Sequence, residues 1–251
     1  MANLNLYAQA DMRNLGASYG SVTSYSSDHI SLSNYPYAAT YYGSFKFSNT
    51  GLSGGTITGY KHWMNGKLSY EVSEVKVSAM TVNKYLNKGD GNSVQSYVLS
   101  GNDNITGSIY NDYIKAWAGN DVVNGNQGSD TLEGGLGADI LTGGKDADVF
   151  KFNVLKESGT TTSTRDTVTD FKNSEKDIID LSEIDANSKI SGNQNFQFIG
   201  NAPFNSKDAT GQLRFDPVTH ILYASTNADI KPEFSILLTG VESLVIDDFI
   251  L

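Results

Sequence analysis

Residues 134–142 read Gly134-Gly135-Leu136-Gly137-Ala138-Asp139-Ile140-Leu141-Thr142, a glycine-rich turn, an aspartate and then an apolar residue two positions later. The pattern recurs every nine residues through the middle of the chain. Its sixth position is always aspartate: Asp103, Asp112, Asp121, Asp130, Asp139 and Asp148. Its eighth position is always apolar: Ile105, Ile114, Val123, Leu132, Leu141 and Phe150. A repeated nonapeptide of the form GGxGxDxUx is typical of a parallel β-helix. The repeats therefore predict an all-β fold with a parallel β-roll over residues 98–153.

The period of the repeat also predicts which aspartates lie together. Each unit supplies a six-residue turn and a three-residue strand, so two units make one coil of eighteen residues. Aspartates eighteen residues apart then stack along one edge (Asp103, Asp121, Asp139) or the other (Asp112, Asp130, Asp148). Adjacent coils lie ~4.8 Å apart, and the apolar residue of each unit faces the inside of the roll.

Carboxylates stacked at this spacing repel one another unless a cation lies between them. Calcium fits such a gap because it accepts roughly six to eight oxygen ligands at about 2.3–2.6 Å in a flexible shell. Backbone carbonyls of the turns supply the remaining oxygens, and glycine allows the backbone conformations that aim them at the ion. We therefore predict about four calcium ions, between residues 103/121, 121/139, 112/130 and 130/148, with one or two more outside these pairs.

Other turn positions complete the predicted metal-binding set. Glycine occupies the first position in four units (Gly107, Gly125, Gly134, Gly143) and the fourth position in four (Gly101, Gly119, Gly128, Gly137). Asn102 and Asn120 directly precede two of the aspartates and belong to the same set. Tyr110 and Asp146 replace the fourth-position glycine elsewhere. A flexible Gly/Asp-rich loop would not keep both the aspartate and the apolar position strict, and an EF-hand pattern is absent.

Composition narrows the classes of function. The 251 residues carry a formal net charge of −10 and a pI near 4.7. This balance disfavours nucleic acid and anionic membrane surfaces as partners, since both attract Lys and Arg. The chain has no cysteine, so calcium must take the stabilising role that disulfides have in many exported proteins. The first residues lack the basic start and apolar run of a secretory signal peptide, and no apolar run is long enough to insert in a membrane.

The C-terminal third carries a succession of further motifs. They occupy residues 166–171 (DTVTDF), 177–186 (DIIDLSEIDA), 196–200 (FQFIG), 211–216 (GQLRFD), 238–241 (LTGV) and 247–251 (DDFIL). Together with the repeats, this succession from Val98 to Leu251 resembles the C-terminal domain of serralysin-type RTX proteins, which carry the hemolysin-type calcium-binding repeat.

This resemblance implies a calcium-stabilised roll followed by a serralysin-like β cap over residues 154–251. It also implies that the extreme C-terminus, ending in Phe249-Ile250-Leu251, is an uncleaved signal for a type I secretion apparatus. The same residues also suit a final apolar strand, and the two interpretations are compatible. Relatives often carry a further ion near the positions of Asp170 and Asp177, which we include as candidate ligands.

The front of the chain departs from serralysins. Those proteases bind catalytic zinc through HExxH, whereas this chain has only His29, His62 and His220, far apart in sequence. The resemblance therefore implies export and calcium binding and not peptide hydrolysis.

Residues 1–97 are predicted to form a β-rich module that caps the roll. Thr56–Thr58 and Leu68–Val72 flank Asn65-Gly66, a strong hairpin signal, and Ala79–Asn87 suits a short helix. Tyrosines cluster in this module at Tyr35, Tyr37, Tyr41 and Tyr42. They suit either a stacking platform for sugars or a packed β-core. His62 as a haem ligand is a weaker alternative. No carboxylate pair of a glycosidase and no Ser-His-Asp arrangement is signalled.

These observations predict a secreted, extracellular calcium-binding protein that has no N-terminal signal peptide and folds on meeting calcium after type I secretion. We expect a non-enzymatic role at a cell surface or in a matrix. Two alternatives stay open. One is a polysaccharide-binding module, similar to those that accompany alginate-modifying enzymes, with extracellular polysaccharide as a partner. The other is an enzyme with an unrecognised site in residues 1–97.

Overall fold

The computed structural model describes residues 21–34, 37–48, 51–64, 67–73, 77–79, 96–97 and 99–251. The chain divides into two compact units, residues 1–106 and 107–251. Strands dominate both units, which confirms the predicted all-β class. The domain limits predicted at 97/98 and 153/154 stay a prediction. Within the described ranges, no helix has the length and apolar character that crossing a membrane requires.

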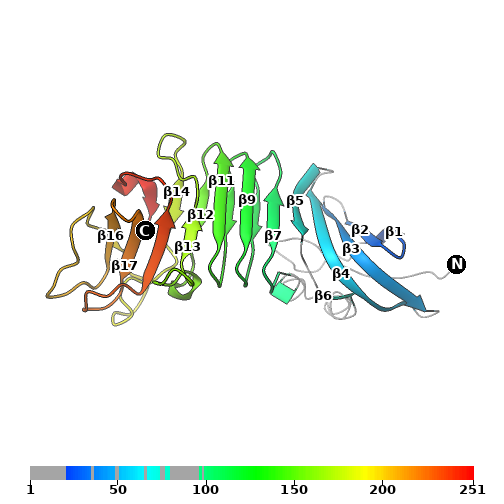
Figure 1. Ribbon diagram of the computed structural model, residues 1–251, viewed down its shortest axis with the longest axis horizontal. Helices are drawn as coiled ribbons and strands as arrows, with labels where there is room; N and C mark the ends of the chain where they lie inside the picture. Colours follow the sequence, from blue (N-terminus) through cyan, green and yellow to red (C-terminus); the bar gives the residue numbers. More distant parts are fainter. Residues whose placement is uncertain are drawn as a thin grey trace. The chain divides into compact units, whose positions relative to one another are not determined.

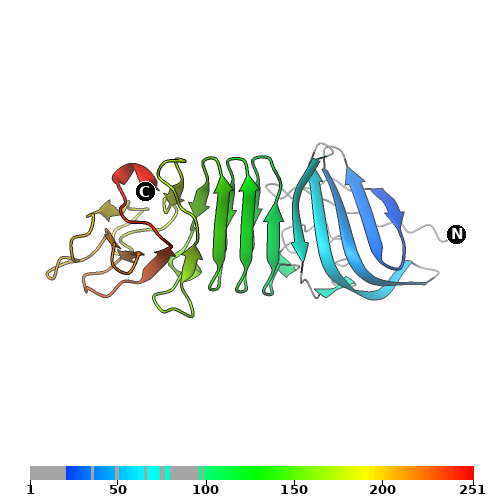
Figure 2. The ribbon, with the colours of Figure 1, turned by 45° about the horizontal axis from the view of Figure 1, so that its top comes forward.

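The first unit is built on an antiparallel meander of long strands (Figure 2). They are β1 (Ser21–Tyr25), β2 (His29–Asn34), β3 (Tyr37–Ser48), β4 (Gly51–Met64) and β5 (Lys67–Ser73), while β6 (Val77–Ser78) pairs with β4. Met64 pairs with Lys67, so β4 and β5 flank the predicted turn. Asn65-Gly66 itself, Tyr35 and residues 80–87 of the predicted helix lie outside the described residues. Strand β7 (Asn104–Gly107) runs across the division between the units.

The nonapeptide repeats of the second unit form a parallel roll. Its strands are β8 (Tyr113–Lys115), β9 (Val122–Gln127), β10 (Thr131–Glu133), β11 (Ile140–Lys145) and β12 (Val149–Lys151). Successive strands alternate between two sheets. In one sheet β9 lies beside β11 (Figure 1), and in the other β8, β10 and β12 are neighbours. Leu141 pairs with Val123, and Leu132 pairs with both Ile114 and Phe150. All of these partners are eighteen residues apart, which confirms the predicted coil.

The apolar eighth position of each repeat fills the inside of the roll. Ile114 is 1% exposed, and Val123, Leu132, Leu141 and Phe150 are 0% exposed. Each such side chain contributes roughly 1.5–3 kcal/mol by leaving water. These stacked side chains form the core of the roll, and their packing holds the strands that carry the turns in place.

The roll continues beyond the repeats with longer connections. Strand β13 (Asp166–Val168) pairs in parallel with β11, and β14 (Ile178–Asp180) pairs with β12. The paired residues are now 27 and 29 residues apart rather than eighteen. The first longer connection contains a 3-10 helix, η1 (Leu155–Glu157). These insertions break the nonapeptide period while the stacking of coils persists.

A β cap completes the second unit, and the predicted likeness of this cap to the serralysin C-terminal domain stays a prediction. It contains β15 (Gln197–Phe198), β16 (Gln212–Asp216), β17 (Ile221–Ser225), β18 (Phe234–Leu238), η2 (Ile246–Asp248) and β19 (Phe249–Ile250). Strand β18 adds to β13, and β19 adds to β14. The last residues therefore form the predicted apolar strand, with Phe249 only 9% exposed. Their role as an export signal stays a prediction.

Candidate metal centre

The turns of the roll arrange the aspartates in two ladders. In each step, one carboxylate oxygen accepts the backbone N–H of the aspartate one coil earlier. Asp139 Oδ1 accepts from Asp121 N at 2.8 Å, Asp130 Oδ1 from Asp112 N at 2.7 Å, and Asp148 Oδ1 from Asp130 N at 2.9 Å. These bonds fix the orientation of every carboxylate in a ladder.

The second oxygen of the ladder carboxylates is buried without a hydrogen bond. This holds for Oδ2 of Asp130, Asp139 and Asp148, and each of these residues is 1% exposed. A buried polar atom left unsatisfied costs about 1–3 kcal/mol, and more when it is charged. A repeated cost of this kind indicates that a ligand belongs beside these oxygens.

Backbone closely surrounds these oxygens. A Cβ on Gly125, Gly134 or Gly143 would overlap Oδ2 of the aspartate five residues later in the same unit. A Cβ on Gly107 or Gly125 would also meet the carbonyl oxygen of the stacked glycine one coil later, at 2.5 and 2.6 Å. First-position glycines thus leave space beside the carboxylates and bring turn carbonyls close. A carboxylate pair lined by carbonyls is an oxygen-rich site, which fits calcium.

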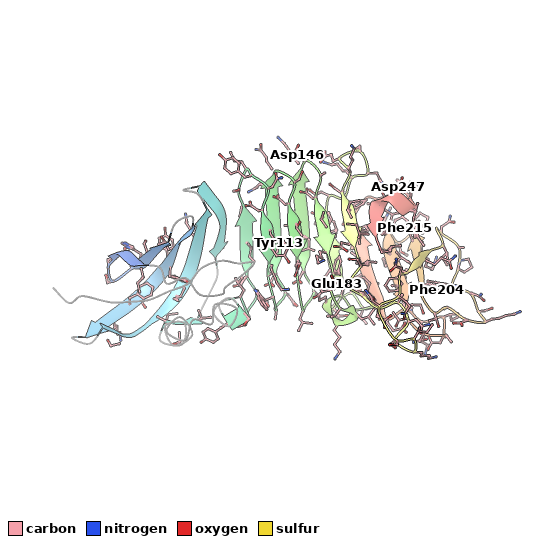
Figure 3. The ribbon with its side chains drawn as sticks, turned by 180° about the vertical axis from the view of Figure 1, so that it is seen from behind. Tyr113, Asp146, Glu183, Phe204, Phe215 and Asp247 are labelled. Atoms are coloured by element: carbon pink, nitrogen blue, oxygen red, sulfur yellow. The ribbon has the colours of Figure 1, made fainter. Side chains whose placement is uncertain are left out.

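The second turn position has a left-handed backbone in four of the units, a feature that the repeat pattern alone does not indicate. Its φ is +99° at Gly135 and +111° at Gly144, but the position is also occupied by Trp117 (φ +74°) and Asn126 (φ +79°). At the fourth position Asp146 takes the role of glycine with φ +78°, in the turn labelled in Figure 3. Left-handed backbone costs a residue with a Cβ about 1–2 kcal/mol, so the turn geometry is imposed by the stacking of the coils.

Burial makes the ladder carboxylates hard to ionise. Desolvation, followed by repulsion from neighbouring acids, raises the pKa of Asp130 to about 8 and that of Asp148 to about 7. Desolvation likewise raises the pKa of Asp139 to about 6. A divalent cation would favour the charged form of each carboxylate and displace its proton. Calcium binding by these ladders therefore competes with protonation.

The ladder of Asp130 and Asp148 is closed at both ends by backbone and hydroxyl donors. At one end Asp112 Oδ2 accepts from Ser108 N at 2.6 Å and from Ser108 Oγ at 2.8 Å. At the other end Asp177 accepts from Asp148 N at 3.0 Å and from Lys172 N at 2.8 Å. Asp112 and Asp177 thus lack the unsatisfied buried oxygen of the central aspartates.

The other predicted ligands fall into different settings. Both oxygens of Asp170 accept backbone N–H groups, from Gly143 and Gly144, at 2.9 Å each. The Asn120 side chain accepts from Ala138 N at 3.0 Å, so it joins adjacent coils. Asp103, Asn102 and Gly101 belong to the first unit, and the predicted pairing of Asp103 with Asp121 stays a prediction. An ion at Asp170 and Asp177 also stays a prediction.

Asp166 is a ladder residue that the nonapeptide period did not reveal. Its Oδ1 accepts from Asp139 N at 2.9 Å, as in the other steps, although the two residues are 27 apart. Its Oδ2 is buried and accepts no hydrogen bond. The available signal was the strand motif of residues 166–168, which continues the parallel stacking after an insertion.

Within the described part of the chain, no three Asp, Glu or His side chains converge as a metal cluster. Ligation in the roll must therefore come from pairs of carboxylates and from turn carbonyls. The other histidines serve local structure. His220 Nδ1 bonds to the carbonyl oxygen of Val241 at 2.6 Å, and the side chain of His62 lies outside the described residues.

The first unit contains a Ser-Asp-His group and part of the predicted tyrosine cluster. Ser26 Oγ and Asp28 Oδ1 both lie at Nδ1 of His29, at 2.8 and 3.0 Å. A catalytic triad needs them at opposite ring nitrogens, so this group is a local turn. Of the predicted tyrosine cluster, Tyr41 is 6% exposed and Tyr42 38% exposed. Lys61 Nζ lies 5.8 Å from the Tyr42 ring centre.

The similarity to a known protein family lies in the roll. No curated protein matches the chain. Among solved structures, the chain is similar to the AlgE6R3 subunit of the mannuronan C5-epimerase of Azotobacter vinelandii. The identity is 25%, the match covers 60% of this chain and 78% of that chain, and the TM-score is 0.42. The family model of the RTX calcium-binding nonapeptide repeat (4 copies) matches residues 97–132 and 125–151. The segment that forms the roll is therefore made of RTX calcium-binding nonapeptide repeats.

Proposed function

We propose that this protein is a secreted calcium-binding protein whose roll folds when the exported chain meets extracellular calcium. The observation that carries the proposal is the row of buried carboxylate oxygens that accept no hydrogen bond, at Asp130, Asp139 and Asp148. Bound calcium supplies the positive charge that these stacked acids lack. The match to calcium-binding repeats supports the same assignment.

The ladder residues make folding conditional on calcium. Where free calcium is low, the acids must take up protons or lose their burial, and a Gly- and Asp-rich chain buries too little apolar surface to fold by itself. Such a chain suits passage through a narrow exporter. Outside the cell, calcium binds only to the folded roll and so stabilises it. The apolar side chains of adjacent coils then pack together inside the roll.

Export by a type I secretion apparatus is the second part of the proposal. It is supported by the C-terminal residues Asp247-Asp248-Phe249-Ile250-Leu251, of which Phe249 and Ile250 pair with β14 as β19. Once the roll has formed outside, β14 offers the edge on which β19 pairs, and folding of this end would prevent the chain from sliding back. We propose a non-enzymatic role at a cell surface or in a matrix.

Removal of residues 247–251 should retain the chain inside a bacterial host that carries a type I exporter. Immunoblots of medium and cells measure the distribution. The full chain should reach the medium, and so should a Gly135→Ala variant. That variant breaks a roll turn but keeps the C-terminus, and it should be protease-sensitive outside. Equal export of the truncated chain, or retention of the full chain, would contradict the export proposal.

A further inference from the structure

The two carboxylate ladders end differently. The ladder of Asp130 and Asp148 ends at Asp177, whose two oxygens both accept backbone N–H groups. The ladder of Asp139 ends at Asp166, which is 0% exposed and whose Oδ2 accepts no hydrogen bond. Asp139 Oδ2 is unsatisfied in the same way. At this end, protein N–H groups therefore satisfy the last carboxylate of the first ladder, whereas the Oδ2 atoms of Asp139 and Asp166 in the second ladder accept no hydrogen bond.

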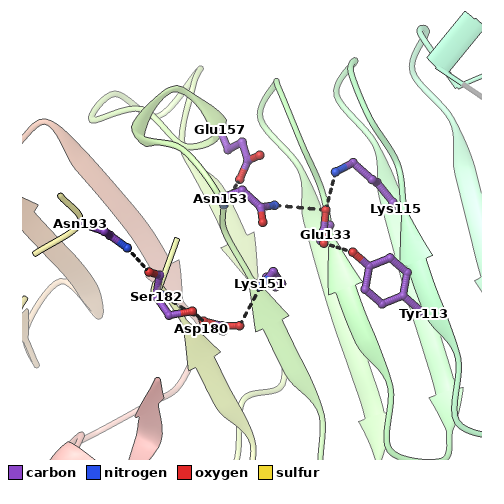
Figure 4. Close-up of polar contacts among 9 residues, drawn as sticks. All are labelled: Tyr113, Lys115, Glu133, Lys151, Asn153, Glu157, Asp180, Ser182 and Asn193. Atoms are coloured by element: carbon purple, nitrogen blue, oxygen red, sulfur yellow. Dashed lines mark hydrogen bonds and ion pairs between the residues drawn. The ribbon is translucent and has the colours of Figure 1, made fainter. Parts of the chain in front are cut away.

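The insertion between β12 and β13 places a further acid at this open end. Glu157 is 8% exposed, and its Oε2 accepts from Asn153 N at 2.6 Å, as Figure 4 shows. The next residue, Ser158, accepts from Asp166 N at 2.8 Å. Ser158 also donates to the carbonyl oxygen of Ser235 at 2.6 Å. The insertion thus holds Glu157 beside the last step of the ladder and ties this step to β18.

These three acids have no protein counter-charge. Among the described residues, no Lys, Arg or His forms an ion pair with Asp139, Glu157 or Asp166. The adjacent Arg165 donates instead to Ser235 Oγ at 2.7 Å and to the carbonyl oxygen of Thr160 at 2.6 Å. Buried acids of this kind need a cation or a proton.

We propose that a calcium ion binds between Asp139 and Asp166, outside the nonapeptide repeats, and that the negative charge of Glu157 strengthens this site. The proposal rests on calcium binding by the roll and extends it to residues that the repeat does not contain. Glu157 adds a further buried acid at this end of the ladder. Negative charge close to a cation strengthens its binding, so loss of the Glu157 charge should weaken the site. The bound ion would anchor the insertion, β13 and, through Ser158, β18.

Calorimetric titration of the full chain with calcium separates the contributions of the two key acids. Asp166→Asn should bind one ion fewer than the original protein, and the binding phase that this variant loses identifies the site. Glu157→Gln should keep the ion count and weaken that phase about tenfold, because it removes charge near the ion. Glu183→Gln is the control. Glu183 is an exposed acid of the same unit and is not a ladder residue, so calcium binding should not change.

The outcomes distinguish this proposal from the proposed function. If the original protein binds no calcium, the function proposed above fails. If it binds calcium and Asp166→Asn retains the ion count, only the terminal site is overturned. A circular dichroism spectrum at saturating calcium checks that each variant folds. If Asp166→Asn does not fold, Glu157→Gln decides, and a calcium titration of that variant identical to that of the original protein overturns the proposal.

Discussion

Removal of calcium at pH 8 should abolish the β-roll and leave residues 98–153 without ordered structure. If each of four sites sees about ten times its dissociation constant, binding adds ~1.4 kcal/mol per site, or ~5–6 kcal/mol in all. This is close to the whole net stability of a typical domain, about 5–15 kcal/mol. Circular dichroism and thermal melting in millimolar calcium and in EDTA measure the effect. Spectra and melting temperatures that do not respond to the chelator would refute it.

Acid provides a control that separates charge repulsion from other effects of the chelator. Asp130, Asp148 and Asp139 have folded pKa values raised to about 8, 7 and 6 by burial, against about 3.9 in an unfolded chain. Between the unfolded and the folded pKa values, the folded state binds more protons than the unfolded state. The free energy of unfolding without calcium therefore rises as the pH falls through this range. In EDTA, the β signal should be larger at pH 5.5 than at pH 8. An equal signal at both pH values would mean that ladder repulsion does not control folding.

Gly135→Ala should destabilise the roll by more than about 3 kcal/mol, even in saturating calcium. Gly135 has φ +99°, a conformation that side chains rarely adopt, and a Cβ there would overlap the carbonyl oxygen of Trp117 in the stacked turn. The clash is with backbone, which cannot rotate away, so adjacent coils must separate. Calcium-dependent melting and the calcium concentration at half-folding measure the loss.

Alanine substitutions at two other glycines separate the cost of the left-handed backbone from the cost of the steric clash. Gly200 has φ +64° but no atom within 4 Å of an added Cβ, so Gly200→Ala reports conformational strain alone, about 1 kcal/mol. Gly54 has no left-handed φ, and an added Cβ there meets other atoms only at ordinary contact distance, 3.8 Å, so Gly54→Ala should be nearly neutral. If Gly135→Ala melts like Gly200→Ala, the close approach of the coils is not what stabilises the roll.

The roll and its core could be predicted from the sequence because two positions of the repeat are strict. Leu132 and Leu141 lie inside, as the strictly apolar eighth position predicts, and their pairing partners follow from the eighteen-residue coil. The ends of the ladders could not be predicted in this way. Asp166 follows Asp139 by 27 residues, so an analysis based on a nine-residue frame with eighteen-residue stacking passes over it.

The capping of individual aspartates also escaped sequence reasoning. Asp112 matches the repeat as well as Asp130 does, but Ser108 bonds to its second oxygen. The repeat pattern is defined by its aspartates, glycines and apolar residues, so it does not indicate a role for serine at the second turn position. Trp117 occupies a position where glycine would be expected. Its backbone is left-handed (φ +74°) although its side chain is bulky, because the turn stacks on its neighbours. In the first unit, the hairpin signal at Asn65-Gly66 predicted strands, but no residue pattern there indicated a chemical function.

The position of bound ions tests the central claim most directly. Crystals of the full chain grown with calcium, measured where calcium scatters anomalously, would locate each ion. We expect anomalous peaks between Asp121 and Asp139, and between Asp130 and Asp148, each at about 2.3–2.6 Å from carboxylate and turn carbonyl oxygens. A folded roll whose turns contain no anomalous peak would contradict the account.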